Sequence, residues 1–96
     1  MRFKLSFTPE AASVLKRLET ENNPKLKKVQ KALGLLETNP RHPGLSTHEF
    51  TSLAGPAGEK VFEAYVESRT PGAWRVFWYY GPTRGMIRVL NIAPHP

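Results

Sequence analysis

Residues 73–80 read AWRVFWYY, a turn follows at Gly81-Pro82, and residues 86–92 read MIRVLNI. Aromatic and β-branched residues dominate both runs, which predicts two strands joined by a tight turn. Because side chains alternate between the faces of a strand, Arg75, Phe77 and Tyr79 share one face and the two tryptophans, Trp74 and Trp78, share the other. A guanidinium among aromatic rings on an open sheet face suits a phosphate and a stacked base, so this stretch indicates an RNA ligand.

The segment before this pair predicts a third strand, at residues 60–68, and a weaker candidate precedes it at residues 46–53. Turns rich in glycine and proline separate these runs, at residues 54–58 and 70–72. Alternation in the third strand divides its side chains between two faces. The core face is expected to carry Phe62, Ala64 and Val66, and the open face Glu63, Tyr65 and Glu67.

The last strand is largely apolar on both faces. Strict alternation places Met86, Arg88, Leu90 and Ile92 on one face, and Ile87, Val89 and Asn91 on the other. A strand that needs cover on both sides predicts a partner segment, or a second copy of the chain, over the open face.

The N-terminal half predicts a strand at residues 2–8 and two amphipathic helices, at about residues 9–21 and 24–38. Thr8-Pro9-Glu10 is a typical helix start. A short link between the helices favours an antiparallel hairpin. The expected fold is α+β with two layers, in the order β-α-α-β-β-β-β: an N-terminal strand and a helical hairpin packed on a mainly antiparallel sheet of four or five strands. Residues 1–96 are expected to form one domain.

Composition restricts the function classes. The net charge is +6 and the pI about 10.0, which favours polyanions or acidic proteins as partners. The absence of cysteine excludes disulfides and thiolate catalysis. No apolar run approaches the roughly 20 residues of a spanning helix, and the N-terminus lacks a signal-peptide pattern, so we expect a cytoplasmic protein without a membrane role. His42 and His48 lack metal-ligand spacing and are interpreted as loop histidines, and no metal or cofactor is expected.

Taken together, these motifs resemble the RelE/ParE toxin superfamily of bacterial type II toxin–antitoxin systems. Four features carry the resemblance: Phe3–Phe7 followed by Thr8-Pro9-Glu10-Ala11; a lysine-rich second helix closing in Leu36-Glu37-Thr38-Asn39-Pro40; Val61–Tyr65 followed by Trp74-Arg75-Val76-Phe77, which looks like the family's "yRv" strand; and a final hydrophobic strand ending in a polar residue, here His95. The resemblance covers essentially the whole chain.

The resemblance implies one of two activities. Members on the RelE side cleave mRNA at the ribosome by promoting attack of a ribose 2′-OH on the adjacent phosphate, whereas members on the ParE side inhibit DNA gyrase. Both kinds are held inactive by a cognate antitoxin. The prediction is a RelE-like mRNA endoribonuclease whose partners are an antitoxin, mRNA and the ribosome, with a homodimer possible. A ParE-like inhibitor or a non-toxic antitoxin-binding relative is the alternative.

The resemblance also assigns candidate catalytic residues. Arg75 would contact the scissile phosphate, and His95 would exchange protons near neutral pH. Lysines are common in the family on the strand before "yRv", but the outward positions here are acidic, so Glu63 or Glu67 is the candidate carboxylate base. An exposed ion pair between Arg75 and one of these glutamates is the competing interpretation.

Further residues are candidates for contacts to RNA. The set comprises Arg69, Phe77 and Tyr79, together with Lys27, Lys28 and Lys31 on the second helix. The aromatic rings would stack a base and the cations would contact phosphates. A solvated cationic helix face is the alternative for the lysines.

Overall fold

The N-terminal half folds as its local signals direct. The computed structural model describes residues 2–96. Strand β1 (Lys4–Phe7) leads into helix α1 (Pro9–Thr20), where the Thr8 hydroxyl accepts the Ala11 backbone N–H at 3.1 Å. This N-cap satisfies one of the free donors of the first helical turn. Helix α2 (Lys25–Thr38) follows, and a short 3₁₀ turn, η1 (Pro43–Leu45), leads into the sheet.

The remaining strands are β2 (His48–Ala54), β3 (Lys60–Tyr65), β4 (Trp74–Tyr80) and β5 (Met86–Pro94). They form one five-stranded sheet with β1, in the order β1-β5-β4-β3-β2. β1 runs parallel to β5, and the other neighbours are antiparallel. The sequence-based prediction of an α+β fold with a helical hairpin on a mainly antiparallel sheet is therefore confirmed.

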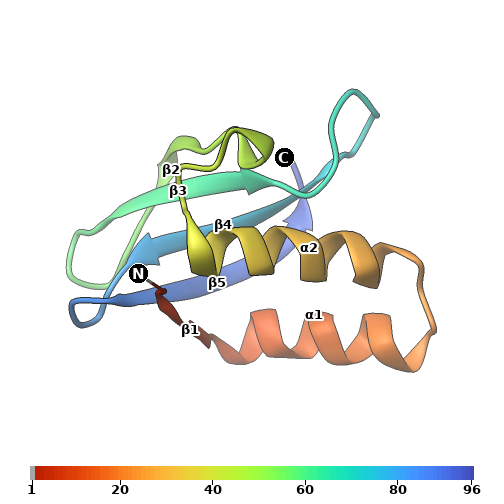
Figure 1. Cartoon of the computed structure of the whole chain (residues 1–96), viewed down its shortest axis with the longest axis horizontal. Coiled ribbons are helices and arrows are strands. Elements are labelled where there is room, and N and C mark those ends of the chain that lie inside the picture. The colour runs from red at the N-terminus through yellow and green to blue at the C-terminus, as the bar shows by residue number, and fades with distance from the viewer. Residues whose placement is uncertain (1) are drawn as a thin grey trace.

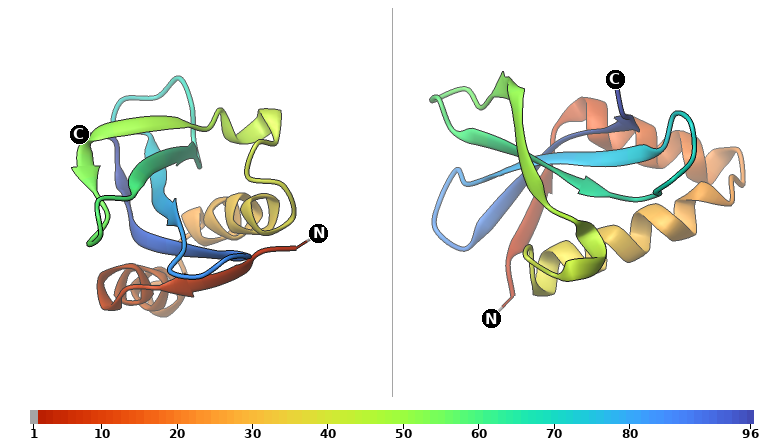
Figure 2. Two further views of the ribbon diagram at one scale, coloured as in Figure 1. Left: turned by 90° about the vertical axis from the view of Figure 1, so that its left-hand side faces the viewer. Right: turned by 90° about the horizontal axis from the view of Figure 1, so that it is seen from above.

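The helices α1 and α2 lie side by side along one face of the sheet (Figure 1). The views in Figure 2 show that the other face has no helix over it and that β2 bends across the outer edge of the sheet. Buried apolar side chains fill the space between the two layers. The largest are Leu18, Leu36, Leu45, Trp78, Ile87 and Ile92. Trp74 packs at the edge of the same core, so both tryptophans lie on the face that the sequence predicts.

A bulge in β5 changes which of its residues face the helices. Phe77 pairs with Asn91, but the next residue of β4, Trp78, pairs with Val89, so β5 has one extra residue. A bulge of this kind reverses the alternation beyond it. Ile92 therefore joins Ile87 and Val89 in the core, and Asn91 turns to the open face beside Phe77. The strict alternation expected for this strand was wrong after Val89.

Among the described residues, neither helix has the length and apolar character needed to cross a membrane.

We expect Leu36→Ala to lower the free energy of unfolding by about 3 kcal/mol, because Leu36 is 0% exposed between the helix layer and the sheet. Urea unfolding followed by circular dichroism measures the change. The control is Leu53→Ala, since Leu53 is 48% exposed and should lose less than about 0.5 kcal/mol. Equal losses in the two variants would contradict this assignment of the core.

Candidate active site

A buried carboxylate lies at the centre of the open face. Glu63, on β3, is only 1% exposed. Its Oε1 lies 2.6 Å from His48 Nε2 on β2, and its Oε2 lies 2.9 Å from His95 Nδ1 beyond β5. A buried charge is tolerated only when it is paired and hydrogen-bonded. The two histidines meet that requirement, so the three side chains form one connected group, here called the Glu63 triad.

Hydrogen-bond donors and acceptors restrict the protons of His48. Its Nδ1 lies 2.9 Å from the Ser46 carbonyl oxygen, which can only accept, so Nδ1 carries a proton. Its Nε2 faces Glu63 at 2.6 Å, and one proton is shared along that contact. Both nitrogens of His48 are therefore engaged. This residue holds Glu63 in place but has no nitrogen left to exchange a proton with a substrate.

His95 differs because only one of its nitrogens is used. A carboxylate oxygen at 2.9 Å from Nδ1 fixes the tautomer in which Nδ1 donates and Nε2 has a free lone pair. The backbone N–H of His95 donates to the Ala73 carbonyl at 2.8 Å, which anchors the segment after β5. The ring also lies against Phe50, with centroids 6.4 Å apart. His95 thus has the arrangement of an oriented general base.

Arg75 lies on the same face, on β4, and is 7% exposed. Its Nη1 donates to two backbone carbonyls, at 2.6 Å to Glu67 and 3.1 Å to Trp74. Its Nε is buried and has no partner among residues 2–96. Within residues 2–96, Arg75 forms no ion pair with a glutamate side chain, which argues against the competing interpretation of its role. The guanidinium is held through Nη1, and Nη2, which forms no hydrogen bond within residues 2–96, is the nitrogen that remains for a ligand.

Tyr65 connects the two halves of the site. Its ring lies under the guanidinium of Arg75, 3.6 Å from Cζ to the ring centroid, and its centroid is 5.8 Å from that of His48. Tyr65 and Arg75 line a cavity of about 430 Å³ together with Ser46 and Arg69. Arg69 has a φ of 61°, a left-handed conformation in the loop before β4. A phosphate in this cavity would lie between two cations.

Glu67 does not belong to this face, and the expectation that it does was wrong. β3 ends at Tyr65, and the chain then turns so that Glu67 reaches Lys25 and Lys28 of α2, at 3.2 and 3.3 Å. Partial burial acts to raise the pKa of Glu67, but hydrogen bonds from Lys25, the Trp74 N–H and Lys28 outweigh it and hold the pKa below its usual value. Through these contacts, Glu67 holds the loop that contains Arg69 against α2.

The aromatic candidates are also placed differently from the prediction. Phe77 and Tyr79 do point away from the helices, but both are buried. Phe50 of β2 covers Phe77, with ring centroids 5.0 Å apart at 60°. Neither ring is open to a stacked base, so the expected exposure of these two residues was wrong.

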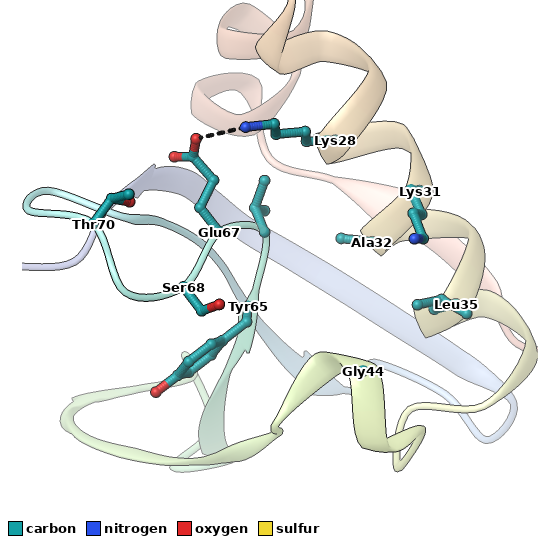
Figure 3. Close-up of a pocket in the computed structure, with 10 residues that line it drawn as sticks. Lys28, Lys31, Ala32, Leu35, Gly44, Tyr65, Glu67, Ser68 and Thr70 are labelled. Atoms are coloured by element: carbon teal, nitrogen blue, oxygen red, sulfur yellow. Dashed lines mark hydrogen bonds and ion pairs between the residues drawn. The ribbon is translucent and has the colours of Figure 1, made fainter.

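The lysines of α2 lie at the edge of a groove that continues into the Arg75 cavity. Figure 3 shows Lys28 and Lys31 on one wall, with Tyr65 and Ser68 on the other. Lys28 is tied to Glu67, and Lys27 is exposed but does not line this groove. Lys31 is thus the candidate best placed to extend a cationic path towards Arg75.

His48 is the site residue that the sequence interpretation missed. It was taken for a loop histidine, but it opens β2 and pairs directly with Glu63 in the strand register. A His opposite a Glu on paired strands is a usable signal only when the register is known. No group of three or more His, Asp, Glu or Cys side chains within residues 2–96 is arranged to hold a metal ion.

No protein-family model matches the sequence, and no curated protein sequence matches it. Solved structures do match. A YoeB/ParE toxin from Agrobacterium tumefaciens has a TM-score of 0.71 at 11% identity, covering 97% of this chain and 99% of its own. A chain of the archaeal RelE–RelB complex from Pyrococcus horikoshii has a TM-score of 0.68 at 15% identity, covering 98% and 96%. A chain of the DinJ–YafQ toxin–antitoxin complex from Escherichia coli has 0.67 at 14%, covering 99% and 94%.

This chain therefore has the fold of the RelE/ParE toxin superfamily over essentially its whole length. The resemblance found in the sequence is confirmed at the level of the fold. The fold alone does not show what this chain does, so its function has to be argued from the residues of the site.

We expect Glu67→Gln to lower the free energy of unfolding by about 1 kcal/mol at pH 7, through loss of its pairing with Lys25 and Lys28. A carboxylate whose pKa is lowered by folding stabilises the protein above its unfolded pKa, and this contribution disappears as the pH falls through the folded pKa. The difference between the variant and the wild type should shrink below about pH 4. Denaturant unfolding across the pH range measures it.

The control for Glu67→Gln is Glu49→Gln, because Glu49 is exposed on β2. It should change the free energy of unfolding by less than about 0.5 kcal/mol at both pH 3 and pH 7. A Glu67→Gln effect of the same size at pH 3 and pH 7 would show that the ion pairs contribute nothing.

Proposed function

We propose that this chain is a RelE-like toxin of a type II toxin–antitoxin system and an endoribonuclease that cleaves mRNA, with the ribosome presenting the substrate. One observation carries the proposal: a buried carboxylate, Glu63, orients His95 as a base on the same open face that holds the half-free guanidinium of Arg75. A base and an anion-binding group are the two components that cleavage by a neighbouring 2′-OH requires.

The first step is removal of the 2′-OH proton. Nε2 of His95 accepts it, and the positive charge that forms on the imidazole is stabilised by Glu63 through the 2.9 Å contact at Nδ1. His48, bound to the other carboxylate oxygen, prevents Glu63 from rotating away. The role of the triad is to keep the basic nitrogen of His95 pointed out of the sheet.

The second step is displacement at phosphorus. The 2′-oxygen forms a bond to the phosphorus, and the bond to the 5′-oxygen breaks. That oxygen takes a proton from a water molecule, and the hydroxide formed takes back the proton held by His95, which restores the base. The products are a 2′,3′-cyclic phosphate and a 5′-hydroxyl. Charge grows on the non-bridging oxygens in the transition state, and Arg75 would bind them through Nη2, because Nη1 is engaged and Nε is buried. Because Nη1 is already fixed by two carbonyls, the guanidinium needs little reorganisation.

The electrostatic setting supports a nucleic-acid substrate. The chain carries a net charge of +6. Arg69 lines the cavity of Arg75, and Lys31 lines the groove that leads into it. These cations would draw the RNA backbone towards the Glu63 triad. Lys27 and Lys28 would contribute to the same field from α2.

We assign a cognate antitoxin as the regulatory partner. The matching structures include complexes of RelE with RelB and of YafQ with DinJ. The basic surface of this chain suits a segment rich in carboxylates, and such a segment lying over the open face would cover both His95 and Arg75. Inhibition would then follow from blocked access without any change in the triad.

The catalytic roles are tested with purified protein, ribosomes and a defined mRNA, with cleavage mapped by primer extension. We expect His95→Ala and Glu63→Gln to lower the cleavage rate at least about 100-fold, because each removes the oriented base. Arg75→Lys should also lose at least about 100-fold, since an ammonium cannot replace the fixed planar fork. Glu49→Gln and His42→Asn, which lie outside the triad, should retain full activity.

Intact mRNA with the wild-type protein, together with arrested growth of cells that express it, would contradict cleavage and favour a gyrase-type inhibitor. Intact mRNA with normal growth would favour a non-toxic relative that only binds an antitoxin. Retained cleavage in His95→Ala would refute the assignment of the base while leaving the reaction class in place.

A further inference from the structure

A second cavity opens on the same face, next to the Glu63 triad but separate from the Arg75 cavity. It has a volume of about 370 Å³ and lies between β2 and β5. Its walls include Phe50, Ser52, Leu53, Phe77, Asn91 and Ala93. The Phe50 ring forms one wall and also contacts the His95 ring, at 6.4 Å between centroids. A group in this cavity would therefore be a direct neighbour of a nucleotide bound at His95.

The cavity offers apolar faces suited to a flat ring. Phe50 is only partly buried, and its packing on Phe77 at 5.0 Å holds its orientation. Leu53 provides a second apolar wall and is 48% exposed, so its side chain is accessible to a ligand in the cavity. Phe50 is thus available for the stacking that the buried Phe77 and Tyr79 cannot provide.

Asn91 supplies one polar group with a defined direction. Its Oδ1 accepts the backbone N–H of Ile92 at 2.9 Å, which leaves the side-chain NH₂ as the part free to reach a ligand. The bulge in β5 is what places Asn91 on this face, paired with Phe77. The Asn91 NH₂ group, a donor in an apolar cavity, can donate a hydrogen bond to an acceptor on the edge of a base, such as a carbonyl oxygen.

From this geometry we infer that the cavity between β2 and β5 is a base-binding subsite, in which Phe50 stacks the base of the nucleotide next to the cleaved bond and Asn91 selects guanine or uracil over adenine. The inference rests on the proposed function for its substrate class. A base, rather than a protein segment, is the occupant that the charges favour, because Arg75, which lines the other cavity with Arg69, pairs in the sheet with Ala93 of this one and offers a cation for the attached phosphate. At C6 of a purine or C4 of a pyrimidine, guanine and uracil present a carbonyl where adenine and cytosine present an amino group.

Nuclear magnetic resonance tests binding without any need for cleavage. The side-chain NH₂ signals of Asn91 are followed in ¹⁵N-labelled protein while the 3′-monophosphates of guanosine, uridine, adenosine and cytidine are added separately. We expect the guanosine and uridine nucleotides to move these signals at least threefold further than the adenosine nucleotide at equal concentration. Equal shifts with all four nucleotides, or shifts confined to other parts of the protein, would overturn the subsite.

A change of preference is the sharper test. Asn91→Asp replaces the donor by an acceptor, so cleavage and binding should turn towards bases with an amino group, adenine or cytosine. Phe50→Ala should weaken binding of every base about tenfold without altering the preference. Asn22→Asp, in the link between the helices, is the control for added negative charge and should leave preference unchanged.

The two proposals fail separately. Normal cleavage with an unaltered base preference in Asn91→Asp would refute the subsite and leave the endoribonuclease in place. Base-selective binding that responds to Asn91→Asp, in a protein that cuts no RNA, would keep the subsite and refute the proposed reaction. Binding of an amphipathic peptide in the cavity, with no response to any nucleotide, would assign this surface to a protein partner and overturn the subsite.

Discussion

The site depends on the burial of one carboxylate. Glu63 lies on β3, between β4 and β2, with almost no contact to solvent, and its two oxygens must be satisfied within the protein. His48 and His95 do so from opposite sides. This requirement holds the start of β2, with His48, and the segment after β5, with His95, over the same face of the sheet. The two strands are not neighbours, but both histidines meet at Glu63. The arrangement of the three side chains follows from the cost of leaving that carboxylate unpaired.

The open face carries two separate groups of residues, the Glu63 triad and the surroundings of Arg75. The Glu63 triad provides a nitrogen that can take a proton, and Arg75 provides a fixed cation with one free nitrogen, Nη2. Tyr65 lies between them and packs against both. The loop before β4, held to α2 through Glu67, brings Arg69 to the phosphate side. Structural residues therefore set the distance between the proton-transfer site and the anion site.

The parts of the fold that depend on local periodicity were predictable from sequence. Apolar spacing gave the helices, and alternation correctly placed Arg75 and Glu63 away from the core. The errors arose where non-local geometry decides the outcome. Glu67 was placed on the open face because nothing local shows that β3 stops at Tyr65. His48 was missed because its partner is fifteen residues away in the chain and only the strand register brings them together.

The bulge in β5 is a second feature that could not be predicted from the sequence. Its position depends on the pairing of β4 with β5, and it exchanges the roles of neighbouring residues. Ile92 enters the core and Asn91 leaves it, although strict alternation assigns them the other way round. The burial of Phe77 likewise depends on the bend of β2, which brings Phe50 over it. Strand patterns in the sequence therefore locate the sheet, but tertiary pairing selects which side chains reach the solvent.

The most direct measurement is the protonation of the two histidine rings, read from ¹⁵N chemical shifts of the imidazole nitrogens near neutral pH. If Glu63 orients both rings, His95 should show a protonated Nδ1 and an unprotonated Nε2, and His48 should have a proton on Nδ1 and a strongly hydrogen-bonded one at Nε2. A His95 ring with its proton on Nε2 would show that the carboxylate does not organise the site.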